Sequence, residues 1–193
     1  MMDATPFAAI LGVLVLVCLF GIGMYNGLVR ARNETRNIFG SVDAMLKKRF
    51  DLIPNLVASV QEYVGHEERT LVQLTSLRAR AADPRTSPGE RVKLDGDLTR
   101  GLSALFATVE AYPALRASEN FLNLQQTLHE VEEQLAAARR AYNATVTDYN
   151  NRCQTFPSNI VAGLFAFRPM PILATPDVER VNPDVKSLFK RAS

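Results

Sequence analysis

The chain has 193 residues, which leaves room for one domain of ordinary size beside an apolar N-terminal run. Its 22 Lys and Arg against 20 Asp and Glu leave a net charge of +2, too small to indicate a nucleic-acid partner. The two cysteines, Cys18 in the apolar run and Cys153 far along the chain, are not expected to form a disulfide, so the fold should not depend on an oxidising compartment.

The first predicted element is a membrane-spanning helix. Residues 7–25, FAAILGVLVLVCLFGIGMY, carry no charge, and at ~1.5 Å per residue they extend roughly 28 Å, close to the ~30 Å hydrocarbon core of a bilayer. A cleaved signal peptide is the alternative, but its basic leader and small-residue cleavage site are missing. Arg30, Arg32 and Arg36 follow the run at once, so we expect residues 1–6 outside the membrane and the rest of the chain in the cytoplasm.

The membrane helix is expected to continue to Phe50, because apolar residues recur at helical spacing up to that point. Pro54 then interrupts the pattern within DLIPN, and the sequence leaves open whether it bends the helix or starts a new one. Asp51 is the candidate to cap the freed backbone N–H groups, and Asn55 belongs to the same motif. The basic run 47–49, KKR, is expected to face either another protein or solvent, since it lies roughly 33 Å beyond the membrane exit.

The next helix is expected to run to about Ala82. Its inner face should consist of Leu56, Val60, Val64, Leu71, Leu74 and Leu77. After the loop DPRTSPGE, a further helix should start with Ser87 as its cap and Pro88 in its first turn. This helix should end at Tyr112, because Pro113 disfavours the helical conformation in the residue before it.

The last long helix shows the most regular pattern, with apolar residues at alternating steps of three and four. Ser118 is its candidate cap, and it should end near Cys153. Its packed face should consist of Phe121, Leu124, Leu128, Val131, Leu135, Ala138, Tyr142, Thr145 and Tyr149. Such a stripe indicates a helix that contacts partners along its whole length.

Residues 157–193 are apolar first and rich in proline afterwards, which predicts a short helix and an extended tail. The segment 160–173 holds a single charge and is too short to span a bilayer, so something must cover it. It can fold back over its own bundle, pack on a neighbouring copy, or dip into the membrane interface. We expect a homo-oligomer whose assembly uses this segment together with the membrane helix, with Phe165 and Phe167 as the candidate contact residues.

No motif indicates catalysis. The sequence HEERT at 66–70 begins like the HExxH motif of zinc proteases but lacks the second histidine. The Glu-x-x-His spacing of di-iron bundles is also missing before His66 and His129. Neither histidine is placed to activate Cys153 or a serine. We therefore expect no enzymatic activity, no metal, no cofactor and no small-molecule substrate.

The polar residues of interest fall in two YNxxV motifs, at 25–29 and 142–146. Tyr25 is expected to anchor the helix at the membrane interface, and Tyr142 lies at a core position where its hydroxyl needs a partner. Asn26 and Asn143 follow these tyrosines, and an asparagine near a packed face can set the register of packing. A role in specificity within the bundle is favoured over ligand binding.

Three segments together resemble the LemA family. They are YNGLVRARN at 25–33, KKRFDLIPNLVASVQEYVGHE at 47–67 and RRAYNATVTDYNNRCQTFP at 139–157. Arg32 and Asn33 of the first segment and Tyr149 of the third join the candidate interaction residues. The resemblance implies a bacterial inner-membrane protein with one N-terminal membrane helix, a short segment outside, and an antiparallel helical bundle in the cytoplasm.

The sequence thus predicts an all-α fold, in which a transmembrane helix precedes an antiparallel bundle of three to four long helices at 26–156. The favoured function is that of a self-associating scaffold that organises or remodels the bacterial membrane. The alternative is an adaptor that presents clients or partners to a membrane protease or other membrane enzyme, with the YN and DLIPN positions forming a docking groove. The expected partners are the lipid bilayer, further copies of the chain and other membrane proteins.

Overall fold

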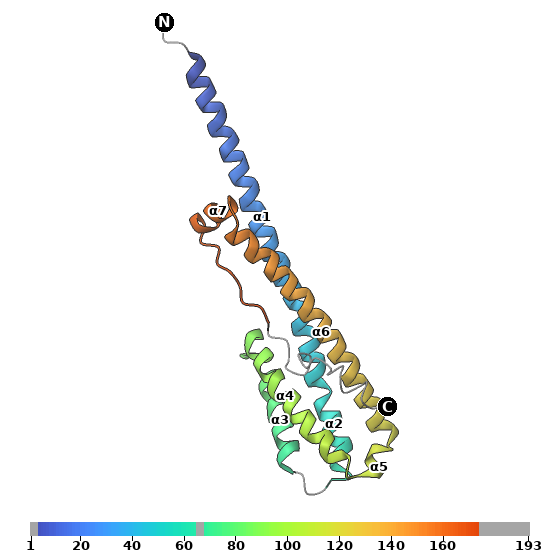
Figure 1. Ribbon diagram of the computed structural model, residues 1–193. Coiled ribbons are helices and arrows are strands. Elements are labelled where there is room, and N and C mark those ends of the chain that lie inside the picture. The colour runs from blue at the N-terminus through green and yellow to red at the C-terminus, as the bar shows by residue number, and fades with distance from the viewer. Residues whose placement is uncertain (1–3, 65–67, 174–193) are drawn as a thin grey trace, which may run out of the picture. The chain divides into compact units, whose positions relative to one another are not determined.

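The computed structural model describes residues 4–64 and 68–173, and every regular element in that part of the chain is a helix. Two helices, α1 and α6, are much longer than the others (Figure 1). The prediction of an all-α fold that begins with a long apolar helix is confirmed.

Helix α1, Ala4–Asp51, is a single helix of 48 residues, so the apolar run continues into the rest of the fold without a break, as predicted. It is long and apolar enough to cross a membrane, with a mean hydropathy of 2.1 over its apolar window and none of that window buried. Ile10, Leu14 and Phe20 are all more than half exposed, which suits side chains that are solvated by lipid. Helix α1 is therefore a candidate membrane anchor.

Pro54 lies in the first turn of α2, which spans Ile53–Gln61. A single residue, Leu52, separates α2 from the end of α1. The intervening Leu52 keeps right-handed helical dihedral angles (φ −78°, ψ −20°), and no side chain caps α2. The capping role predicted for Asp51 was therefore wrong, and its carboxylate instead lies 3.9 Å from the guanidinium of Arg78. A proline has no backbone N–H, so in the first turn of a helix it leaves one fewer N–H without a partner. Helix α2 begins here without a side-chain cap.

The single helix predicted from Pro54 to Ala82 was also wrong, because α2 ends at Gln61 and α3 spans Glu68–Ala82. Periodicity could not detect this break, since Val60, Val64 and Leu71 keep helical spacing across it. The predicted inner face was correct. All of its members are buried: Leu56, Val60, Val64, Leu71, Leu74 and Leu77.

Helix α4, Pro88–Val109, begins as the sequence predicted, with the Ser87 hydroxyl accepting a hydrogen bond from the Glu90 backbone N–H at 3.2 Å. Its predicted end at Tyr112 was wrong by three residues. Pro113 instead opens the short helix α5, Pro113–Arg116, because a proline is well tolerated where a helix starts.

Helix α6, Glu119–Gln154, and the short helix α7, Ser158–Leu164, agree with the predicted elements. The fully buried members of the predicted face of α6 are Phe121, Leu128, Val131, Leu135, Tyr142 and Tyr149. The other three predicted members are partly buried. The residues beyond Leu173 lie outside the described part of the chain, and so does the extended tail predicted for them.

The chain forms two compact units. Of the described residues, the first unit comprises 4–41 and 140–173, and the second comprises 42–64 and 68–139. Each unit has its own buried cluster. That of the first consists of Leu28, Ala31, Tyr149, Cys153, Ala162 and Phe167, and that of the second is larger and draws on the end of α1 and on α2 to α6. Within the second unit α3 packs against both α2 and α4 (Figure 1).

Candidate functional site

An extended strap, residues 167–173, follows α7 and pairs with α6 in the first unit. The side-chain amide of Asn150 donates to the carbonyl of Met170 and accepts from the N–H of the same residue, both at 2.8 Å. Asn143 makes the same two bonds with Leu173, at 2.9 and 2.8 Å. The two asparagines therefore satisfy backbone groups of the strap as a neighbouring β-strand would.

The spacing of these bonds shows why the strap fits the helix. The two asparagines are seven residues apart on α6, a rise of ~10.5 Å. Met170 and Leu173 are three residues apart, ~10 Å of extended chain. The strap thus runs antiparallel to α6 in matching register. Pro169 and Pro171 have no N–H to leave unpaired, and their rings hold the chain extended.

Tyr149 supplies a fifth bond to the strap, because its hydroxyl donates to the carbonyl of Arg168 at 3.0 Å. Burial raises the pKa of Tyr149 to about 12, the neighbouring Cys153 adds to this rise, and the charges of Arg32 and Arg36 oppose it. The hydroxyl therefore stays protonated at every physiological pH.

Tyr142 packs its ring on that of Phe39, with the centroids 5.2 Å apart, and burial raises its pKa as well. Nearby in the first unit, the buried hydroxyl of Thr35 donates to the carbonyls of Ala31 and Thr145, at 3.0 and 3.3 Å. These contacts join α1 to α6.

Four of the predicted residues form an aromatic cluster, the exit cluster, at the end of the apolar run. Its members are Tyr25, Arg32, Phe165 and Phe167. The ring of Tyr25 lies 4.8 Å from that of Phe165 and 5.7 Å from that of Phe167, centroid to centroid. The guanidinium of Arg32 lies 5.2 Å from the centroid of Phe167, within the range of a cation–π contact. The fold thus brings together residues more than 130 positions apart.

The turn between α7 and the strap explains how Phe165 and Phe167 reach this position. Ala166 adopts a left-handed conformation with φ 54°. Its N–H donates to the carbonyl of Gly163, and the N–H of Phe167 donates to that of Ala162. This is the Schellman pattern that ends helices, with alanine where glycine is usual.

The remaining predicted residues are not part of the exit cluster. Asn26 and Asn33 are exposed on α1. Pro54 and Asn55 are exposed in the second unit, where Asn55 lines a shallow depression beside Asn120 and Asn123. The amide of Asn143, proposed for a docking groove, is used by the strap of its own chain.

Sequence reasoning missed Asn150, although a signal was present. The dipeptide Tyr-Asn occurs at 142–143 and again at 149–150, one heptad later, so both asparagines lie on the same flank of α6.

Sequence reasoning also missed a buried charge centre in the second unit. A guanidinium nitrogen of Arg49 lies 2.6 Å from one carboxylate oxygen of Asp95, and one of Arg139 lies 2.5 Å from the other. Arg49 and Asp95 are 2% and 1% exposed. Arg49 also donates to Thr99 at 3.1 Å and to Glu132 at 3.3 Å. The prediction that the run 47–49 faces another protein or solvent was therefore wrong for Arg49.

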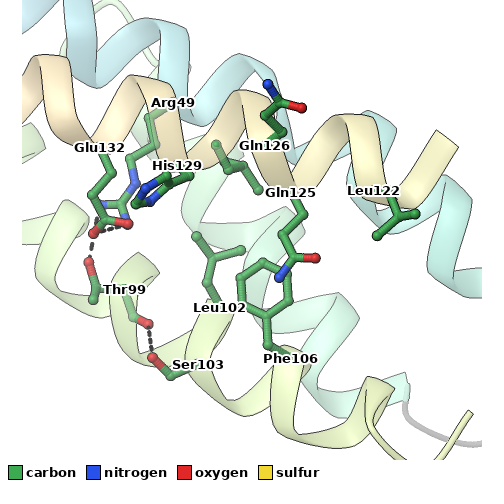
Figure 2. Close-up of a pocket in the computed structure, with 11 residues that line it drawn as sticks. Arg49, Thr99, Leu102, Ser103, Phe106, Leu122, Gln125, Gln126, His129 and Glu132 are labelled. Atoms are coloured by element: carbon green, nitrogen blue, oxygen red, sulfur yellow. Dashed lines mark hydrogen bonds and ion pairs between the residues drawn. The ribbon is translucent and has the colours of Figure 1, made fainter. Parts of the chain in front are cut away.

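Arg49 also borders a groove of about 650 Å³ between α4 and α6. Figure 2 shows this arginine directed toward Thr99 and Glu132, at one end of the groove. Apolar side chains, including Leu102 and Phe106, line the groove together with the polar residues Ser103, Gln125, Gln126 and His129. The groove therefore offers a surface of mixed apolar and polar character.

Within the part of the chain that the structure describes, no group of three or more His, Cys, Asp or Glu side chains is placed to hold a metal ion. His66 and Glu67 of the HEERT motif lie outside the described residues.

Comparison with known proteins agrees with the resemblance seen in the sequence. The model of the LemA family matches residues 38–187. Protein LemA of Metamycoplasma hominis is 31% identical over 170 residues, which cover 86% of this chain and 76% of that protein. Magnetosome proteins MamQ 1 and MamQ 2 of Paramagnetospirillum magneticum are each 24% identical over 169 residues, or 75% of this chain. The chain spans 62% of the length of these two magnetosome proteins.

Proposed function

Since the chain belongs to the LemA family, we propose that it is a membrane-anchored helical scaffold that self-associates and organises or remodels the bacterial inner membrane. The observation that carries this proposal is the uninterrupted helix α1. Its 48 residues extend roughly 72 Å, so one element provides both the apolar run and part of each folded unit. A force or constraint applied to the anchor is passed to the units through continuous backbone hydrogen bonds.

The contacts of the first unit support a structural role. Asn143, Asn150 and Tyr149 use their polar groups to hold the strap, and Thr35 joins α1 to α6. In the second unit the guanidinium of Arg49 donates hydrogen bonds to Asp95, Thr99 and Glu132. These polar side chains thus form their hydrogen bonds within the chain, and we assign catalysis to none of them.

The relatives also support this proposal. Two of them are named magnetosome proteins, which favours a part in an assembled cellular structure for this chain too.

We propose that copies of the chain meet through the membrane helix. The strap is already paired with α6 of its own chain, whereas a side chain added at Gly12 or Gly21 would find nothing within 4 Å. Small residues of this kind allow neighbouring membrane helices to approach closely.

The test is the particle mass of the full chain after extraction in a mild detergent. A large regular particle is expected for the wild type, and a monomer would overturn the scaffold. Gly21→Ile should lower the mass, because the added side chain has room within a single chain and can collide only with a neighbour. Ile22→Leu, one position along the same exposed helix, is the matched control and should leave the mass unchanged.

We propose that both units lie in the cytoplasm, on the evidence of Arg30, Arg32 and Arg36 after the apolar run. Cys153 is buried and makes a poor reporter of topology. A Leu122→Cys variant in a chain with both native cysteines replaced offers a reporter at a half-exposed position. A thiol reagent confined to the cell exterior should fail to label it, and labelling would reverse the orientation.

The second candidate function is an adaptor that presents partners to a membrane enzyme. The groove between α4 and α6 favours it, because apolar side chains such as Leu102 and Phe106 lie there beside polar groups such as Gln125. Recovery of a defined heterologous partner from a chain that stays monomeric would favour this function over the scaffold.

A further inference from the structure

Apolar side chains gather on and beside α7, and the described part of the chain leaves them largely uncovered. Phe156, Ile160, Leu164 and Phe165 are 74%, 62%, 78% and 55% exposed. We infer that this surface, the α7 patch, is a second membrane contact, which lies in the boundary between headgroups and acyl chains beside the spanning helix. The inference rests on the proposed insertion of α1 and adds a lipid contact to it.

The first argument is the level of α7 along the anchor. Ser158, at the start of α7, lines a crevice of about 420 Å³ together with Leu19, Phe20, Gly23 and Met24 of α1. These four residues belong to the last two turns of the apolar run, and the distance from Leu19 to Tyr25 is ~9 Å along the helix. The crevice also reaches Gly27 and Leu28, so helix α7 begins beside the end of the apolar run, where an interfacial helix would meet the membrane boundary.

The second argument is the way α7 divides its surface. Ala162 is 2% exposed and faces the buried cluster of the first unit. Ile160 and Leu164 are four residues apart, so they share the opposite, uncovered side of the helix. An aromatic contact links this surface to the anchor, because the ring of Phe165 packs on that of Tyr25 at the membrane exit. Figure 1 shows α7 beside α1.

The third argument is charge. From 152 to 173 the sequence contains Arg152 and Arg168 and no acidic residue. Arg152 lies at the level of Gly27, where a side chain added to the glycine would come within 3.7 Å of its guanidinium. Arg152 pairs with Asp148 at 3.0 Å, whereas Arg168 is exposed. A basic side chain beside an apolar surface suits anionic headgroups.

The chain contains no tryptophan, so one introduced tryptophan reports a single position. Leu164→Trp is the test variant, Leu14→Trp reports the centre of the span, and Leu122→Trp reports a half-exposed position in the second unit; all three leucines are exposed. The full chain is placed in vesicles of phosphatidylcholine and phosphatidylglycerol that carry a spin-labelled lipid, with the label either near the headgroup or near the bilayer centre. Far-UV circular dichroism confirms that each variant keeps the helical content of the wild type.

Emission from Leu164→Trp is expected to be quenched about twofold more strongly by the shallow label than by the deep one. Leu14→Trp should show the reverse order, and Leu122→Trp should show no quenching. An unquenched Leu164→Trp beside a quenched Leu14→Trp overturns the α7 patch and leaves the anchor standing. Blue-shifted emission without quenching identifies a protein contact instead and also overturns it. An unquenched Leu14→Trp overturns the anchor and the α7 patch together.

Discussion

The pairing of the strap with α6 predicts the effect of Asn150→Asp. An ionised carboxylate can still accept from the N–H of Met170, but it has no donor for the carbonyl of that residue. One hydrogen bond is lost and a carboxylate faces a carbonyl oxygen in a partly buried site. The expected cost is about 1–3 kcal/mol, which corresponds to a rise of about 5- to 150-fold in the opening equilibrium of the strap.

Amide hydrogen exchange of the full chain in detergent measures this opening directly. The N–H groups of Met170 and Leu173 should lose protection, whereas those in the middle of α6 should keep it, because the change is confined to the strap. Lowering the pH should restore the protection, since a protonated carboxyl group regains a donor for the carbonyl of Met170.

The matched control is Asn151→Asp, which adds the same charge at the neighbouring exposed position. It should leave the protection of both strap amides unchanged. Equal loss of protection in the two variants would mean that charge rather than the amide pairing decides the result. No loss in Asn150→Asp would refute the pairing itself.

Four further predictions concern stability. Asp95→Asn leaves two arginines beside a neutral amide in the buried charge centre, so urea unfolding followed by circular dichroism should show a loss of about 3–5 kcal/mol; an unchanged midpoint would contradict this. Ala166→Gly removes the strain of a left-handed alanine and should raise the free energy of unfolding by up to about 1 kcal/mol, whereas a lower melting temperature would speak against the turn described. The pKa of Tyr149 is about 12 in the folded chain and 10 in the unfolded chain. Its contribution to the free energy of unfolding is therefore fully present below pH ~10 and is lost as the pH rises toward ~12. This loss, up to roughly 3 kcal/mol, should be missing in Tyr149→Phe. Asp51→Ala should change the free energy of unfolding by less than about 0.5 kcal/mol, because the carboxylate caps no helix and makes one exposed contact. A larger loss would indicate that Asp51 does cap α2.

Several features followed from the sequence alone because their causes are local. A charge-free run of membrane length, a serine before a proline, and apolar residues at steps of three and four need no knowledge of the rest of the fold. They predicted the candidate anchor helix, the Ser87 cap at the start of α4 and the buried face of α6. The same rules failed where periodicity continued across a break, at the residues between α2 and α3.

The buried charge centre shows a signal that was present but incomplete. Arg49 follows Val42 and Leu46 at helical spacing, so its position on the inner face could be read from the sequence. The sequence did not show how this buried position is stabilised, because a buried guanidinium is tolerated only if a carboxylate pairs with it. That partner, Asp95, belongs to α4 and lies 46 residues further along the chain.

Only the tertiary structure decided what the asparagines and aromatic residues do. An asparagine on a helix flank can bond to solvent, to a neighbouring helix or to an extended segment, and the sequence is the same in each case. Asn143 and Asn150 bind the strap because the turn at Ala166 sends the chain back along α6 in matching register. The same reversal carries Phe165 and Phe167 to Tyr25. Local propensity determines where helices begin and end, whereas such pairings depend on which surfaces the folded chain brings within bonding distance.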